Sequence, residues 1–253
     1  MQFGNGGRRM VTGHVPESDD VSYLDPRRPA LRAPAETLAL VNLCASLAAL
    51  SRRQEPTSLA RRLYTESWCR LLAREGTRAT MLATLAEALA ATRLGDLDQA
   101  GLARLGVAAP AAAQARLRAF AVAAAPVDVE LRLALRMQLP ARPAPQLELP
   151  AVLGVQMDRP PGAAPGESLA EQSLRLALLG ALLSVETGAA AEAVFLAALA
   201  EPLPTLLDLP EGLATEIAAA RAAVAVAGSP AAKAMALALA GGISLMPVSL
   251  YAA

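Results

Sequence analysis

An alternating run near the middle of the chain is the feature that most restricts its fold. From Val127 to Leu139 every second residue is apolar, and charged or polar residues fill nearly all the gaps. A repeat of two residues is typical of a β-strand with one buried face. A strand of this length would extend about 40 Å. The run therefore predicts a long amphipathic strand whose apolar face must be covered.

A second strand is expected just downstream. After a proline-rich connection at 140–145, an apolar stretch occupies 147–157. Pro150 lacks an amide hydrogen, so within a strand it would have to lie at an edge or a bulge. Antiparallel pairing is preferred but not required, because the connection is longer than a tight hairpin turn. We therefore expect a β-ribbon or hairpin at about 127–157.

The rest of the chain is expected to be helical. Hydrophobic residues make up 54% of the chain but aromatic residues only 3%, so Ala, Leu and Val must fill most of the core. Such a core favours helices over a β-sandwich. The predicted fold class is mainly α (α+β), with antiparallel helical bundles and one β-ribbon. Helical periodicity is found at about 35–53, 57–75, 77–94, 97–105, 110–124, 169–186, 189–200, 211–227 and from 230 onward.

Several local signals mark where helices begin and end. Ser168 and Glu171 match a capping box, in which a hydroxyl and a carboxylate bind amides at a helix start. Ser229 and Pro230 are suited to the N-cap and first turn of another helix. Gly76 is expected to end the helix that begins after Pro56.

The same signals suggest a division of the chain into four parts. Residues 158–167 are rich in Pro and Gly and make the best boundary. The N-terminal residues show no periodicity, which predicts an extended or disordered arm. The expected parts are an arm at 1–33, a helical domain at 34–125, the β-ribbon at 126–158 and a second helical domain at 159–253.

Few residues suited to catalysis are present. The chain has one histidine, His14, which falls in the predicted arm and is expected to be solvated. No phosphate loop, dinucleotide-binding motif or metal-ligand spacing is found, so we expect no cofactor and no metal. Cys44 and Cys69 are expected to be buried free thiols, which would suit a cytoplasmic location. Enzymatic activity is therefore uncertain and disfavoured.

The charge pattern gives no reason to expect nucleic acid as a partner. Acidic and basic residues balance at 23 each. Tyr64 and Trp68 share a helix face beside arginines, but the same spacing is produced by a packed core, which we prefer. Residues 234–253 carry no charge and are long enough to cross a bilayer, although Gly and Pro interrupt them. A buried helix with an extended tail is the preferred interpretation there.

The favoured function is non-catalytic protein–protein interaction or assembly, with the β-ribbon and the N-terminal arm as docking elements, because exposed strand edges readily pair with another chain. Coverage of the ribbon's apolar face by helices of the same chain is the alternative to such docking. The expected partner is either another protein or a second copy of the chain. One alternative is a helical domain that binds or converts a small molecule in a pocket invisible to sequence spacing. The other is membrane association through the C-terminal stretch. Expected partner-binding residues are Tyr23, Val129, Leu131, Leu133, Leu135 and Met137.

Overall fold

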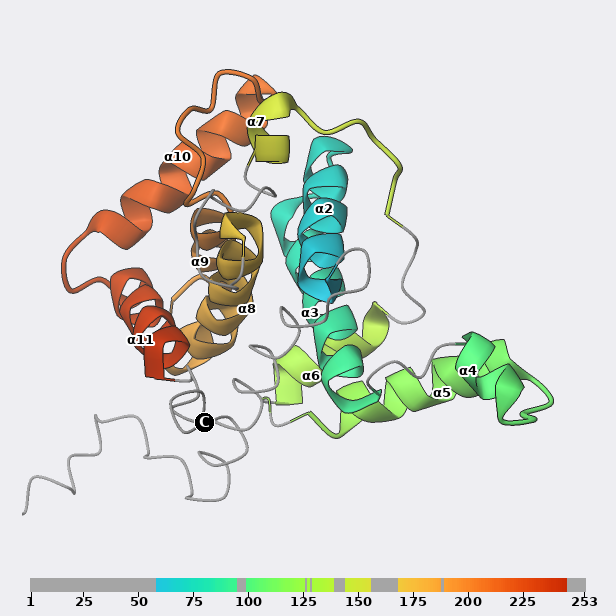
Figure 1. Cartoon of the computed structure of the whole chain (residues 1–253). Helices are drawn as coiled ribbons and strands as arrows, with labels where there is room; N and C mark the ends of the chain where they lie inside the picture. The colour runs from blue at the N-terminus through green and yellow to red at the C-terminus, as the bar shows by residue number, and fades with distance from the viewer. Residues whose placement is uncertain are drawn as a thin grey trace, which may run out of the picture. The chain divides into compact units, whose positions relative to one another are not determined.

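A computed structural model describes residues 58–94, 99–125, 127, 129–138, 144–155, 168–187 and 189–244. The chain divides into two units, Met1–Arg32 and Ala33–Ala253, and all described residues belong to the second. These residues form ten helices and no strand (Figure 1). The helices are α2 (Leu59–Leu72), α3 (Thr77–Leu94), α4 (Gln99–Arg104), α5 (Pro110–Ala123), α6 (Val129–Met137), α7 (Ala151–Val155), α8 (Leu169–Thr187), α9 (Ala191–Leu199), α10 (Glu211–Ala225) and α11 (Pro230–Ser244).

Helical periodicity predicted most of these elements correctly. α2 to α5 and α8 to α11 begin and end within a few residues of the predicted ranges. The helix expected at about 35–53 and the boundary at 158–167 lie outside the described residues. The proposed division into an arm and two helical domains stays a prediction.

The predicted β-ribbon is wrong, because its first strand is the helix α6. Leu, Ala, Arg and Met are good helix formers, and Glu130 in the first turn and Arg136 in the last complement the helix dipole. Two-residue steps on a helix place alternate apolar residues on different faces. Leu131 and Leu135 therefore point into the core, where Leu135 is fully buried. Val127, just before α6, is also buried, whereas Val129, Leu133 and Met137 form an exposed row. Leu139 lies outside the described residues.

The second predicted strand is also wrong. Residues 144–150 are extended but pair with no strand in the described chain, and α7 follows at once. Pro150 precedes the first residue of α7, and its carbonyl accepts a hydrogen bond from the Leu153 amide at 2.9 Å. The amide of a residue just before a helix takes no part in the hydrogen bonds within the helix, so proline is tolerated there. Leu153 is buried and anchors this short helix.

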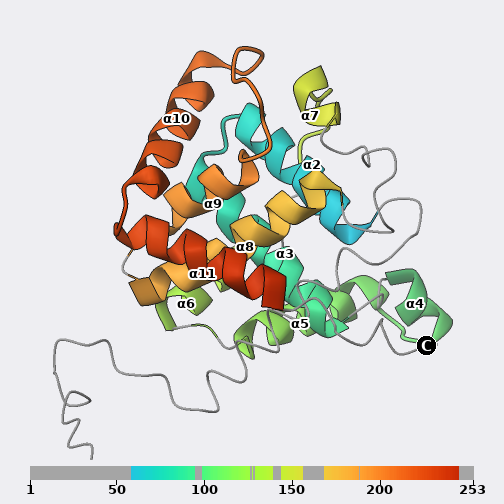
Figure 2. The same ribbon diagram turned by 60° about the vertical axis from the view of Figure 1, so that its left-hand side comes forward.

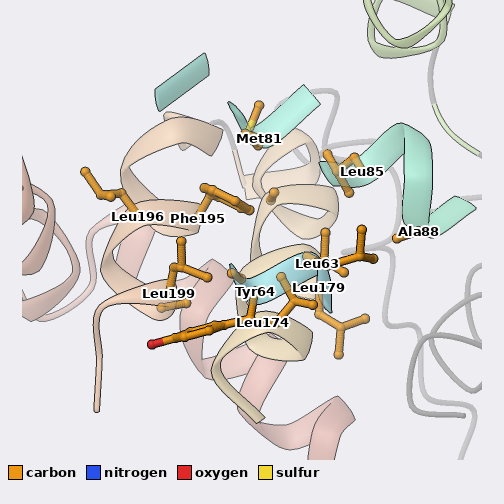
Figure 3. Packing of buried hydrophobic residues seen from close by; sticks show 14 of the residues in the cluster. Leu63, Tyr64, Met81, Leu85, Ala88, Leu174, Leu179, Phe195, Leu196 and Leu199 are labelled. Carbon is orange, nitrogen blue, oxygen red and sulfur yellow. The ribbon is translucent and has the colours of Figure 1, made fainter. Parts of the chain in front are cut away.

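The core surrounds α8, which packs against α9, α11 and α2. In Figures 1 and 2, α8 lies beside α9 and between α11 and α2, and α3 contacts both α8 and α9. Figure 3 shows side chains from α2, α3, α8 and α9 meeting in one cluster. The largest fully buried side chains there are Trp68, Tyr64 and Phe195.

One glycine allows α8 and α9 to approach closely. A Cβ atom added to Gly180 would lie 2.6 Å from Cγ1 of Val194, which is closer than carbon atoms pack. Val194 is fully buried and β-branched, so its side chain has few other rotamers. The absence of a side chain at position 180 therefore sets the spacing of these two helices.

The predicted capping box is confirmed. The Ser168 amide donates to Glu171 Oε2 at 2.7 Å, and the Glu171 amide donates to Ser168 Oγ at 3.3 Å. Glu171 is buried, and its Oε1 also accepts a hydrogen bond from the hydroxyl of Ser58, the N-cap residue of α2. One carboxylate thus joins the starts of two helices, where it also favours both helix dipoles. The predicted N-cap Ser229 is confirmed by a 3.0 Å hydrogen bond from the Ala232 amide.

Candidate functional site

A cavity of about 970 Å³ is lined by residues of α2, α3 and α5, by Gln99 of α4 and by the extended segment 144–147. This volume is in the range of small-molecule sites. Four arginines and two glutamates line it, so its wall has a formal excess of two positive charges. These residues are Arg62, Glu66 and Arg70 of α2, Glu87 of α3, and Arg116 and Arg118 of α5.

The α2 side of the cavity comes from residues four positions apart. Arg62, Glu66 and Arg70 share one face of the helix, opposite the face that buries Tyr64 and Trp68. Nε of Arg62 lies 3.9 Å from Oε1 of Glu66, a pair exposed enough to contribute little stability. An amphipathic helix thus places apolar groups in the core and charges in the cavity.

Arg70 differs from the other charged residues of α2. On the helix it lies away from the face of Tyr64 and Trp68, but it is buried. Its guanidinium donates to Glu75 Oε2 at 2.8 Å, just past the end of the helix. The Glu75 amide also donates to the Arg70 carbonyl at 3.1 Å. The turn that ends α2 therefore holds this arginine in place at the cavity wall.

Arg118 is the most enclosed arginine contributed by α5. It forms an ion pair with Glu87 of α3, and both side chains are mostly covered. Burial lowers the pKa of the Arg118 guanidinium, the charge of Arg62 lowers it further, and Glu66 acts in the opposite direction. Arginine remains protonated at neutral pH even so. A guanidinium has five N–H donors, so one carboxylate partner leaves donors for a bound anion.

The remaining wall is mostly apolar. Ala111, Ala115 and Ala119 of α5 are four residues apart and line the cavity together. Ala144, Pro145 and Leu147 line it from the extended segment. The thiol of Cys69 lies 3.8 Å from the Leu147 carbonyl oxygen and is also part of the wall. The cavity thus combines a charged side and an apolar side.

The residues expected to bind a partner lie on two faces of α6. Leu131 and Leu135 pack inward, whereas Val129, Leu133 and Met137 are 67%, 56% and 83% exposed. Only the exposed three are positioned to contact another molecule, and partner binding itself stays a prediction. Tyr23, His14 and Cys44 lie outside the described residues.

Two expectations about individual side chains are confirmed. Tyr64 and Trp68 are fully buried, with their rings edge to face and centroids 6.1 Å apart, so they belong to the core. Cys69 is a buried free thiol. Among the described residues, no group of three His, Cys, Asp or Glu is placed to hold a metal ion.

The sequence did not predict that these four arginines line one cavity. The arginines of α2 were considered only as neighbours of Tyr64 and Trp68, and Arg116 and Arg118 were given no role, because a charged row on one helix looks the same whether it faces water or a cavity. The only indication in the sequence was that α2 carries a row of charged residues and α5 carries a row of alanines. The two rows are more than forty residues apart in the chain, and only the packing of α3 against both helices brings them together.

No single described helix is long and apolar enough to span a membrane. α10 and residues 230–239 of α11 would satisfy length and composition only as a pair, and they meet at an angle of 85°. Of the C-terminal stretch proposed to contact a membrane, residues 234–244 belong to α11, and Ala234 and Ala238 are buried. Residues 245–253 lie outside the described residues.

Comparisons with protein-family models, with curated proteins and with solved structures gave no match. The proposals below therefore depend on the residues of this chain alone.

Proposed function

We propose that this protein binds a small organic anion in the cavity between α2, α3 and α5. The observation that carries the proposal is the convergence of four arginines from two helices on one cavity. Arginine is suited to this role because its planar guanidinium pairs with carboxylate or phosphate through two parallel hydrogen bonds. The role proposed is binding, and no reaction is assigned to the site.

The positive excess of the cavity wall favours anions over cations. Four arginines face two glutamates there, and at the partly water-filled edge of a protein each close unit charge is worth about 4 kcal/mol before desolvation. Neutral and cationic molecules would gain nothing from this field. A buried anion would recover part of its lost hydration from the guanidinium donors.

Two of the arginines are already held in position. Arg118 is paired with Glu87, and Arg70 with Glu75. Fixing a long side chain before binding reduces the conformational entropy that binding must remove. Glu75 and Glu87 therefore position these arginines, and Glu87 also limits the net charge of the cavity wall.

Isothermal titration calorimetry on the full chain with phosphate, succinate, citrate and octanoate tests the proposal. At least one of these anions is expected to bind with a Kd below the millimolar range. Arg118→Gln is expected to weaken that binding about tenfold or more, because a charged hydrogen bond is worth about 1.5–3 kcal/mol.

Arg136→Gln is the matched control, since Arg136 is exposed on α6 and does not line the cavity. It is expected to leave the affinity unchanged. Equal losses in both variants, or no binding by any of the four anions, would overturn the proposal.

A second candidate function is self-association through α6. Val129, Leu133 and Met137 form an exposed apolar row four residues apart, which two copies of the helix could bury against each other. Three side chains cover less than the roughly 1,000 Å² that a specific interface requires, so the association would be weak. This small area is why the cavity is the preferred site.

Sedimentation equilibrium at increasing protein concentration tests self-association. A reversible dimer is expected for the native chain, and Leu133→Asp is expected to abolish it. Glu130→Gln, a change beside the row, is the control. A strict monomer at all concentrations would exclude this candidate.

A further inference from the structure

We infer that the ligand of the cavity is an amphipathic monocarboxylate, with its carboxylate at the arginines and an unbranched apolar body along α5. The inference rests on the proposed function and specifies its ligand. It follows from the different chemistry of the two sides of the cavity, and from where the charged side meets the apolar one.

The apolar side is a row of methyl groups along one helix. Ala111, Ala115 and Ala119 lie one turn apart, so the row is roughly 12 Å long. Pro145 and Leu147 line the same cavity from the extended segment. An extended chain of about eight to ten carbons matches the length of this row. Alanine leaves room for a ligand where a larger side chain would fill the space.

Arg118 lies at one end of that row, and Arg116, which also lines the cavity, follows Ala115 at its middle. Arg118 directly precedes Ala119, the last alanine of the row, and Arg62 is near enough to affect the Arg118 pKa. Ala111 lies two turns away, toward the start of α5. A carboxylate bound at Arg118 would therefore direct its apolar body toward Ala111.

The two glutamates favour a ligand with a single charge. Glu87 is paired with Arg118, and Glu66 lies near both Arg62 and Arg118. A second negative charge on the ligand would be repelled by these carboxylates at short range. A carboxylate satisfies the free guanidinium donors with one charge, whereas a phosphate or a dicarboxylate brings two.

Affinity is expected to increase with the length of the ligand. Burying one methylene group contributes about 0.8 kcal/mol, which is about fourfold in Kd when burial is complete. The cavity is open on one side, so we expect a twofold to fourfold decrease in Kd per methylene. Butyrate, hexanoate, octanoate and decanoate, each below its critical micelle concentration, are the probes.

The experiment is calorimetric titration of the full chain with this series and with decanol. Kd is expected to decrease at each step of the series, and decanol is expected to bind at least tenfold more weakly than decanoate. Arg118→Gln should weaken all four carboxylates by a similar factor. Ala111→Asp should weaken decanoate at least tenfold and leave butyrate unchanged.

The Ala111 variant is designed to preserve the fold. Ala111 is exposed and lies in the first turn of α5, where an aspartate is compatible with the helix dipole. Ala218→Asp, an exposed position on α10 outside the cavity, is the matched control and should bind every probe as the native chain does. Circular dichroism on each variant confirms that the helices are retained.

The outcomes separate this inference from the proposed function. Binding of citrate or phosphate together with an affinity independent of chain length would overturn the inference and leave the proposed function standing. Equal binding of decanol and decanoate, or an Ala111→Asp variant that binds decanoate normally, would also overturn it. Failure of every anion to bind would overturn both.

Discussion

α9 and α5 are both rich in alanine, but only α5 contains arginines, and the surroundings of the two helices are opposite. In α9, every residue from Val194 to Leu199 is buried, because α8, α10, α11 and α3 all pack against it. In α5, only Ala121 and Val122 are buried, although most of the helix is Ala, Leu, Phe or Val. It packs against α3, α4 and α6, and the rest of its surface faces solvent or the cavity.

The difference shows that neighbouring elements, together with composition, decide how much of an alanine-rich helix is buried. Alanine facing another helix permits close packing, as where Ala238 of α11 approaches Gly180. Alanine facing the charged row of α2 leaves a space instead. Alanine therefore permits close packing between α11 and α8 but leaves a cavity between α5 and α2.

The strongest test of this contrast compares two phenylalanines. Phe195 on α9 is fully buried, whereas Phe120 on α5 is 70% exposed. Phe195→Ala should lower the free energy of unfolding by about 3–5 kcal/mol, because it removes buried surface and leaves a void. Phe120→Ala should change it by no more than about 0.5 kcal/mol. Urea denaturation of both variants measures the difference, and similar losses would contradict the contrast.

A second pair of substitutions tests α6 against the strand that its sequence suggested. Leu135 is fully buried and Leu133 is 56% exposed, although both would lie on one face of a strand. Leu135→Ala should cost about 2–4 kcal/mol. Leu133→Ala should cost no more than about 0.5 kcal/mol. Equal effects in denaturation experiments would favour the strand and contradict the helix.

α6 also shows where sequence reasoning fails. Helices such as α3 and α8 were predicted because their apolar periodicity, capping residues and propensity agree. In α6 the apolar residues alternate, but Val129, Leu133 and Met137 are exposed. The alternation therefore does not identify the residues that are buried. Periodicity predicts structure only when the apolar residues are those that the fold buries.

The candidate site was beyond the same reasoning for a different reason. Helical periodicity predicted that α2 and α5 each have distinct faces. It assigned Tyr64 and Trp68 of α2 to the core, and both are buried. That Arg62 and Ala115 line one cavity depends on how α3 packs against both helices. No local pattern contains that information, because tertiary packing sets it.

The core side of α2 should respond to high pH. Burial raises the pKa of Tyr64 from its ordinary value of about 10 to about 12, and Trp68 acts in the opposite direction. The folded state thus holds the phenolic proton more tightly than the unfolded state. Stability from this group is complete below pH 10 and decreases as pH rises toward 12. The expected loss is about 2–3 kcal/mol over that interval.

Denaturation of the native chain and of Tyr64→Phe across this pH range measures the effect. The phenylalanine variant lacks the titrating group, so the difference between the two pH profiles isolates Tyr64 from the arginines and Lys233. Parallel profiles would show that the Tyr64 hydroxyl is accessible to water.

Close packing of α8 on α9 is tested by adding a single methyl group. Gly180→Ala gains up to about 1 kcal/mol of helix propensity. It also places a Cβ against Val194, and overpacking of this kind costs about 1–3 kcal/mol, so a net loss of about 1 kcal/mol is expected. Thermal or urea denaturation provides the measurement.

Two controls show whether the contact is the cause. In a Val194→Ala background the added methyl fits, so Gly180→Ala should become stabilising. Gly212 in α10 has no atom within 4 Å of an added Cβ, so Gly212→Ala should stabilise by about 0.5–1 kcal/mol. A loss at Gly180 that persists without the valine side chain would rule out the proposed clash.

The smallest expected effect is at the turn between α2 and α3, helices that border both the core and the cavity. Arg74 follows the C-cap of α2 and has φ +61°, a left-handed conformation in which a side chain costs about 1–2 kcal/mol. The turn requires it, because the Arg74 and Glu75 amides donate to the Leu71 and Arg70 carbonyls. These two bonds form a Schellman motif, whose left-handed position usually holds glycine.

Arg74→Gly should therefore raise the free energy of unfolding by about 0.5 kcal/mol, since relief of strain exceeds the extra entropy of glycine in the unfolded chain. Arg74→Ala removes the charge but keeps the Cβ, so it should not stabilise. Equal gains from both variants in denaturation experiments would assign the effect to charge and not to backbone strain. Because the Arg70–Glu75 pair lies in the same turn, anion affinity measured on Arg74→Gly should be unchanged.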